Sequence, residues 1–144
     1  MIGKTITELC VGDMAEFSKT VSESDIYLYA GITGDFNPAH LDEEYAKGTF
    51  FKTRIAHGML SAGFISTVLG NKLPGPGTVY VKQALNFLAP VHIGDTITAR
   101  VEVMEIDTEK NRIKVKTLCV NQDGTTVLDG EALVSPPKVP KQDG

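Results

Sequence analysis

Hydrophobic and polar positions follow a helical period in the first half of the chain and a strand period in the second. Residues Glu23 to Gly34 carry apolar side chains at helical spacing after a plausible N-cap, Ser22, which predicts an amphipathic helix. A short strand is expected before it, from Met14 to Val21. Asp42 to Ala46 predicts a brief helical turn, and Lys47 to Ile55 an irregular loop.

The longest apolar segment runs from His57 to Leu69. Leu60, Phe64 and Val68 form one ridge at helical spacing, and further apolar residues occupy most of the remaining circumference. A helix that is apolar nearly all round is typical of a protein interior, so we expect this helix to be buried. The Gly70-Asn71 pair predicts its C-terminal end.

After a run of Pro and Gly between Leu73 and Gly77, the hydrophobic period changes to two. Turn residues separate several alternating segments, which predicts antiparallel strands joined in sequence order. The expected strands are Thr78 to Leu88, Thr96 to Val103, Arg112 to Val120 and Thr125 to Val134. From Pro136 the chain is rich in Pro and Lys, which favours one domain over 1–135 and a flexible tail over 136–144.

One buried helix followed by a meander of long antiparallel strands predicts an α+β fold. The sheet has to cover the helix, because no other element is long enough to do so. An open sheet also leaves an edge strand, and pairing such edges across a homodimer would satisfy it. We therefore expect the hot-dog fold, a curved antiparallel β-sheet wrapped around a central buried α-helix, usually in a dimer.

Composition narrows the function classes. With 144 residues, 42% hydrophobic and 22% charged, the chain fits one globular domain. The net charge of -4 argues against nucleic acid as a partner. No apolar run is long enough to span a membrane, and the N-terminus lacks the pattern of a signal peptide, so a cytoplasmic location is expected. Cys10 and Cys119 are expected to be reduced thiols.

The segment from Asp35 to Asp42 carries the candidate chemistry. It places a carboxylate, Asp35, and an imidazole, His40, on either side of an Asn37-Pro38 turn, so that the two side chains can converge. Such a pair is suited to acid–base catalysis on a water molecule. Two alternatives are a purely structural turn and a metal site with Asp42, although Asp42 is equally suited to cap the next helical turn.

This segment resembles the signature D-x-N-P-x-H-x-D of the MaoC-like (R)-specific enoyl-CoA hydratases. Ile55-Ala56-His57-Gly58-Met59-Leu60 is similar to that family's I-x-H-G-M-L motif, and the likeness extends from about Val11 to Val134. The resemblance implies that Asp35 and His40 hold the reactive water. It further implies that the backbone N–H of Gly58 forms the oxyanion hole and that the hydroxyl of Ser66 supports the site.

Other residues near these motifs have weaker assignments. His57 and Asn37 are expected in supporting roles, with His57 hydrogen-bonded to backbone and Asn37 shaping the turn. Ser66 has the alternative of bonding to the carbonyl one helical turn earlier. Three residues are weak candidates for contacts with substrate, against the alternatives of core packing or solvent exposure: Met59, Leu69 and Lys82.

The resemblance implies a hydro-lyase that interconverts a trans-2-enoyl-CoA and an (R)-3-hydroxyacyl-CoA by syn addition of water. It also implies an acyl-CoA thioester as the substrate and neither a metal nor another cofactor. One alternative on the same scaffold is a (3R)-hydroxyacyl-carrier-protein dehydratase, and another is a non-catalytic module that binds acyl thioesters. A thioesterase is a further alternative, which the release of free CoA would reveal.

Overall fold

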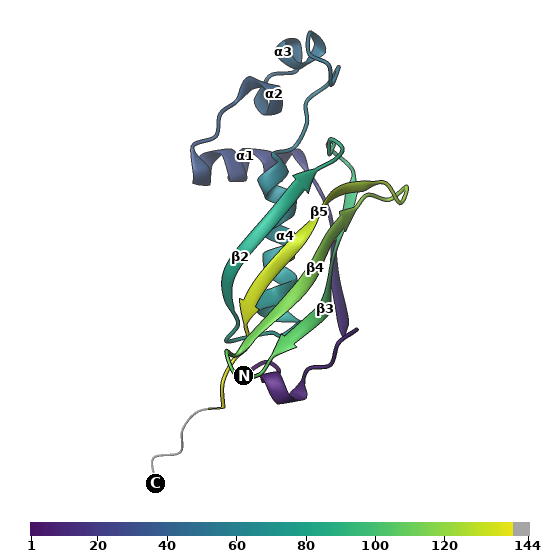
Figure 1. The fold of residues 1–144 in the computed structure, drawn as a ribbon. Helices are drawn as coiled ribbons and strands as arrows, with labels where there is room; N and C mark the ends of the chain where they lie inside the picture. Colours follow the sequence, from purple (N-terminus) through teal and green to yellow (C-terminus); the bar gives the residue numbers. More distant parts are fainter. Residues whose placement is uncertain (140–144) are drawn as a thin grey trace.

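Five antiparallel strands form one sheet in this computed structural model, which describes residues 1–139 (Figure 1). The strands are β1 (Met14–Thr20), β2 (Val79–Phe87), β3 (Thr96–Asp107), β4 (Arg112–Val120) and β5 (Thr126–Ser135). The helices are α1 (Glu23–Thr33), α2 (Pro38–Leu41), α3 (Glu43–Lys47) and α4 (Gly58–Asn71), with a 3-10 turn, η1 (Ile6–Glu8), near the N-terminus. Every strand expected from the sequence is present, and β3 is longer than expected.

The strand order is β1-β3-β4-β5-β2. Only β3, β4 and β5 form the expected meander, because β2 crosses over to pair with β5 and does not lie beside β3. The expectation of a meander through all four later strands was therefore wrong for β2. In consequence β2 is one edge of the sheet and β1 is the other.

Helix α4 packs lengthwise against the sheet, which curves around it (Figure 1). Phe64, Ile65, Val68 and Leu69 are buried on the helix, opposite the alternating buried residues of β3 and β4. This arrangement is the hot-dog fold that the sequence predicts. The helix is not buried all round, however, because Met59, Gly63 and Ser66 leave an exposed stripe along it.

Helices α1, α2 and α3 lie beyond one end of the sheet, next to the N-terminal end of α4 (Figure 1). Ser22 caps α1 by accepting a hydrogen bond from the Asp25 backbone, as predicted. Asp42 caps α3 in the same way by accepting from the Tyr45 backbone, at 3.3 Å. Helix α2 was not predicted, because its single turn falls inside the segment interpreted as an Asn-Pro turn.

The packed chain extends past β5. Pro136 and Pro137 are buried, and the Asn111 side chain donates to the Pro136 carbonyl oxygen at 2.8 Å. The expectation of a loose tail from Pro136 was therefore wrong for these two residues. The part of that expectation covering 140–144 lies outside the described residues.

Candidate active site

Hydrogen bonds between residues close together in sequence shape the Asp35 turn. Helix α1 ends at Gly34, whose positive φ of 81° is the left-handed conformation that favours glycine. The Asp35 Oδ1 atom accepts from the Asn37 backbone at 3.2 Å, and the Asn37 Oδ1 atom accepts from the Ala39 backbone at 3.0 Å. Asn37 thus caps α2, with Pro38 as the first helical residue, and takes the turn-shaping role predicted for it.

His40 lies on this one-turn helix and is buried. Its Nδ1 atom lies 2.7 Å from the Ile55 carbonyl oxygen. A carbonyl oxygen only accepts hydrogen bonds, so Nδ1 must carry the proton. In the neutral imidazole Nε2 is then unprotonated, and it presents a lone pair to any water beside it.

His57 is the N-cap residue of α4 and is also buried. Its Nε2 atom lies 3.0 Å from the backbone carbonyl oxygen of Asp35, so it donates there and anchors the turn. The bond to backbone that was predicted for His57 is therefore confirmed. The ring also stacks between those of His40, with centroids 3.9 Å apart, and Tyr29, at 4.6 Å.

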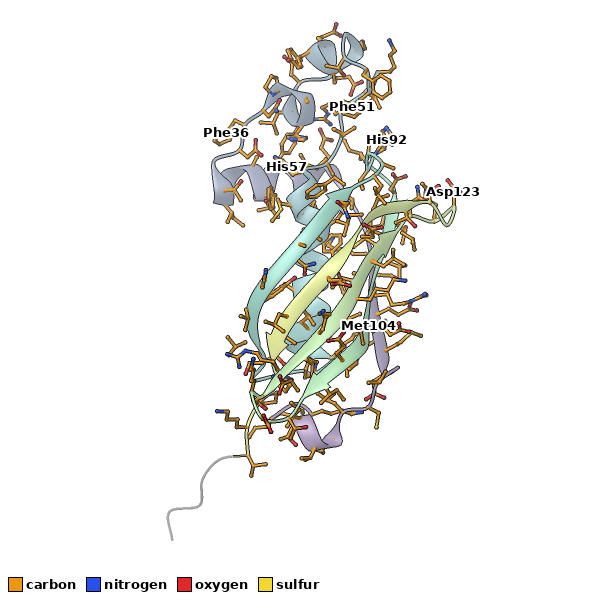
Figure 2. All side chains as sticks on the ribbon, viewed as in Figure 1. Phe36, Phe51, His57, His92, Met104 and Asp123 are labelled. Carbon is orange, nitrogen blue, oxygen red and sulfur yellow. The ribbon has the colours of Figure 1, made fainter. Side chains whose placement is uncertain are left out.

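These contacts bring Asp35, His40 and His57 together although they come from three separate elements. One carboxylate oxygen of Asp35 and one ring nitrogen from each histidine lie within 4.8 Å of one another. Figure 2 shows His57 at the end of α4 beneath the small helices. The Asp35 side chain is exposed whereas both imidazoles are buried, so water has access to the cluster from the carboxylate side. A carboxylate and two imidazoles so close together are of the types that can carry out acid–base chemistry.

The alternative metal site of Asp35, His40 and Asp42 is not formed, because the Asp42 carboxylate caps α3. The cluster that does form contains His57 in its place. One nitrogen of each imidazole is already engaged with a carbonyl oxygen. The other ring nitrogen of each histidine and the carboxylate oxygens of Asp35 carry lone pairs. These lone pairs can accept a hydrogen bond from a water molecule or coordinate a cation.

Gly58 begins α4, where the first backbone N–H groups have no partner within the helix and the helix dipole is positive. A larger residue at position 58 would require the neighbouring side chain of Phe87, which is 56% exposed, to shift. A Cβ atom there would lie 2.7 Å from the Phe87 ring, which packs against the glycine from the end of β2. The Phe87 ring and the start of α4 therefore form one wall.

A cavity of about 530 Å³ opens beside this wall. His40, Gly58 and Met59 line it, and so do Phe50, Phe51 and Phe87. Its lining is mostly apolar, with the His40 imidazole at one point on the surface. An apolar cavity with a single basic group is suited to an acyl chain whose reactive carbons lie next to the imidazole.

Ser66 and Lys82, two residues assigned to the site from sequence, do not reach this cavity. They line a second hollow, of about 370 Å³, between α4 and β2, which Met59 also borders. Leu69 is buried in the core and lines neither hollow. Within residues 1–139, only Met59 among the weak substrate-binding candidates contacts the cavity that holds His40.

Several site residues were not identified from the sequence. Phe50 and Phe51 come from the irregular loop, and Phe87 comes from the last position of β2. An apolar pair within a polar loop is a signal that could have identified Phe50 and Phe51. No sequence pattern indicated that the Ile55 carbonyl would orient His40, because that contact exists only in the folded chain.

No helix within residues 1–139 is long and apolar enough to cross a membrane. This chain is similar to curated proteins that are named as enzymes. It is 58% identical over 126 residues to the (R)-specific enoyl-CoA hydratase of Rhodospirillum rubrum, covering 88% of this chain and 87% of that protein. It is 51% identical to the 3-hydroxybutyryl-CoA dehydratase of Methylorubrum extorquens, covering 94% and 86% of the two chains.

Among solved structures, the fold matches the unliganded R-hydratase PhaJ1 of Pseudomonas aeruginosa with a TM-score of 0.88 and 42% sequence identity. That match covers 99% of this chain and 95% of the other. Residues 11–124 match the model of the MaoC like domain. The histidine cluster at the head of a sheet-wrapped helix and these comparisons lead to one conclusion: this chain is a member of the MaoC-like dehydratase family.

Proposed function

We propose that the protein is an (R)-specific enoyl-CoA hydratase, which reversibly adds water to a trans-2-enoyl-CoA to give an (R)-3-hydroxyacyl-CoA. The observation that carries this proposal is the pairing of the Asp35 carboxylate with a His40 imidazole whose Nδ1 proton is committed to Ile55. We infer that the carboxylate oxygen and the unprotonated Nε2 act on the same water molecule. Both are acceptors, as a water molecule about to lose a proton requires.

In the proposed reaction, the water oxygen bonds to C3 of the enoyl chain. One of the two acceptors takes a proton from that water, and the group protonated in this way passes the proton on to C2, so that H and OH add across the double bond and the acceptor is restored. Charge develops meanwhile on the thioester oxygen, and we propose that the N–H of Gly58 stabilises it, which is supported by the position of Gly58 at the positive end of α4. No electrons are transferred, so the proposed reaction requires no redox cofactor, and we propose that it proceeds without a metal.

A second part of the proposal is a homodimer formed through β2. This edge strand exposes Val79, Tyr80 and Val81, and the adjacent stripe on α4 exposes Met59. Unpaired backbone groups and apolar side chains at one edge favour pairing with the same edge of a second copy. Such pairing would also cover the hollow that Ser66 and Lys82 line.

We propose a cytoplasmic location, which the two free thiols of Cys10 and Cys119 support.

The test follows the ultraviolet absorbance of a 2-enoyl-CoA thioester with wild-type protein, Asp35→Asn and His40→Ala. We expect the wild type to consume the substrate and both variants to be severely impaired. Chiral analysis should identify the product as (R)-3-hydroxyacyl-CoA. Equal activity in all three proteins contradicts the proposal.

The same assay separates the alternative functions. A matched carrier-protein substrate that is turned over much faster than the CoA thioester would indicate the dehydratase. Free thiol released from the CoA ester would indicate a thioesterase. Tight binding without turnover would indicate a module that only binds acyl thioesters.

A further inference from the structure

We propose that Arg54 is a positioning residue that holds His40 in its Nδ1-protonated tautomer by fixing the backbone carbonyl of Ile55. This inference rests on the proposed function, because it concerns the group that would accept a proton from water. It concerns a residue outside both sequence motifs.

The Arg54 side chain is nearly buried, with 11% of it exposed, and it contacts three helices at once. Its Nη2 atom donates to the Glu23 carboxylate at 2.8 Å and its Nη1 atom to the Tyr27 hydroxyl at 3.0 Å, both on α1. Nη1 also reaches the carbonyl oxygen of Leu41, at the end of α2, at 3.5 Å. The guanidinium therefore ties together the helix that precedes Asp35 and the helix that carries His40.

The third helix is reached through Glu43, the first residue of α3. Its carboxylate accepts from the Arg54 backbone at 3.3 Å and from the Thr53 hydroxyl at 2.8 Å, and it lies 3.7 Å from Arg54 Nε. The Tyr27 and Arg54 contacts lower the pKa of Glu23, and the Thr53 and Arg54 bonds lower that of Glu43. Arg54 thus faces two carboxylates that stay ionised.

Ile55 directly follows Arg54, and both of its backbone polar groups make contacts at the site. Its N–H donates to the Ala39 carbonyl oxygen at 3.2 Å, and its own carbonyl oxygen accepts from His40 at 2.7 Å. The backbone therefore contacts two adjacent residues of α2. The Ile55 carbonyl lies in the peptide group shared with Ala56, whose N–H donates to the Val91 carbonyl oxygen at 2.8 Å. That bond holds the segment on one side of the carbonyl, and the contacts of Arg54 hold the residue on the other side.

This geometry decides which nitrogen of His40 is free. If the Ile55 carbonyl shifts, Nδ1 loses its acceptor, and the alternative tautomer, with the proton on Nε2, is no longer disfavoured. An imidazole in that form donates toward the cavity and does not accept. A planar guanidinium is needed for the fork to Glu23 and Tyr27, and a lysine ammonium cannot reproduce it.

The experiment compares Arg54→Gln and Arg54→Lys with Arg100→Gln as a matched control. Arg100 also pairs with a glutamate, Glu16, at 3.0 Å, but on the opposite side of the sheet, where β3 meets edge strand β1. Steady-state kinetics give kcat and KM with an enoyl-CoA. Nitrogen-15 spectra of histidine-labelled protein, which has three histidines, report the tautomer of His40.

In Arg54→Gln we expect kcat to fall by about tenfold or more with KM nearly unchanged, and the His40 signals to show a mixture of tautomers. Arg54→Lys should fold well and fall between the wild type and Arg54→Gln in both readouts. Arg100→Gln should match the wild type.

An unchanged His40 tautomer in both Arg54 variants overturns the proposal, even if activity and thermal stability fall together. If wild-type protein lacks hydratase activity, the proposed function fails. The tautomer spectra then still decide whether Arg54 positions His40, so the two failures are distinguishable.

Discussion

The Nδ1 atom of His40 and the carbonyl oxygen of Ile55 lie 2.7 Å apart, and this one hydrogen bond sets which nitrogen of the imidazole is basic. The two residues are far apart in sequence and meet because α2 folds back over the segment that precedes α4. The bond commits the only proton of the neutral ring to the backbone. It leaves Nε2 free in a ring of which one nitrogen lies within 4.8 Å of an Asp35 carboxylate oxygen.

Replacing either member of the pair should abolish most activity. Asp35→Asn and His40→Gln are each expected to lower kcat by about 10²- to 10⁴-fold, because a positioned acid–base group contributes that much. The measurement is the initial rate of enoyl-CoA hydration. Asp42→Asn is the matched control, because Asn also caps helices and, within residues 1–139, the Asp42 carboxylate accepts a hydrogen bond from the α3 backbone alone. A comparable loss in Asp42→Asn would contradict the assignment.

Gly58→Ala should separate the effects on stability and activity. The added Cβ meets the Phe87 ring at 2.7 Å, so we expect the free energy of unfolding to fall. The fall should be smaller than the about 1–3 kcal/mol of an overpacked core, because Phe87 is 56% exposed and its ring can shift. In the double variant Gly58→Ala with Phe87→Leu, the smaller side chain should recover much of that stability. Activity should stay low in the double variant, because the Cβ still occupies space beside the Gly58 N–H. Thermal unfolding and kcat measured on the same samples test both expectations, and full recovery of kcat would contradict the second.

Ser61 should tolerate loss of its hydroxyl. The Oγ atom is buried in α4 and has no hydrogen-bond partner within residues 1–139. A buried and unpaired polar group costs about 1–3 kcal/mol, so Ser61→Ala is expected to leave the protein equally stable or more stable. Chemical denaturation measures the difference. Ser18→Ala serves as a comparison, because it removes a hydroxyl that is paired with Thr98 at 2.7 Å. A large loss of stability in Ser61→Ala would show that the hydroxyl has a partner.

The two thiols should differ in reactivity with pH. Burial raises the pKa of the Cys119 thiol to about 12, whereas Cys10 is exposed. Alkylation requires the thiolate, and a raised pKa keeps Cys119 protonated until the pH approaches that value. Iodoacetamide at pH 8 should therefore label Cys10 alone in the native protein and both residues in denaturant. Mass spectrometry of peptides reads the labelled sites, and rapid native labelling of Cys119 would contradict the burial.

The β2 edge should govern assembly. Val81 is exposed on this edge strand, so Val81→Asp is expected to convert the proposed dimer into monomer at micromolar concentration. Light scattering coupled to gel filtration measures the mass. Met104→Asp provides the control, because Met104 is similarly exposed but lies on β3, which is not an edge strand (Figure 2). A wild-type mass of one chain would contradict the dimer directly.

Local patterns identified most of the elements. Alternation in Thr96 to Val103 and Arg112 to Val120 predicted two central strands, because a residue in such a strand faces either the core or the solvent. The run from His57 to Leu69 predicted α4 for the equivalent reason at helical period. The Asn37 turn was likewise predictable, since side chains of this kind bond to backbone close by in sequence.

Strand pairing and packing faces required the fold. Nothing in the sequence of β2 shows whether this strand pairs with β3 or with β5. The pairing depends on which edge of the sheet the chain reaches after α4. The stripe of α4 that contains Ser66 was expected to be buried, because the helix pattern alone does not show which side the sheet covers. The sheet of one chain covers the opposite side of α4, so this stripe is exposed.

The sequence by itself determined most of the helix and strand segments, the turn that carries Asp35 and His40, and the glycine at the head of α4. These depend on contacts between residues that are near each other along the chain. Only the tertiary structure decided that His57 anchors Asp35, that Ile55 orients His40, and that Arg54 ties three helices together. Those contacts join distant segments, and their geometry is set by how α1, α2 and α4 pack together at the end of the sheet.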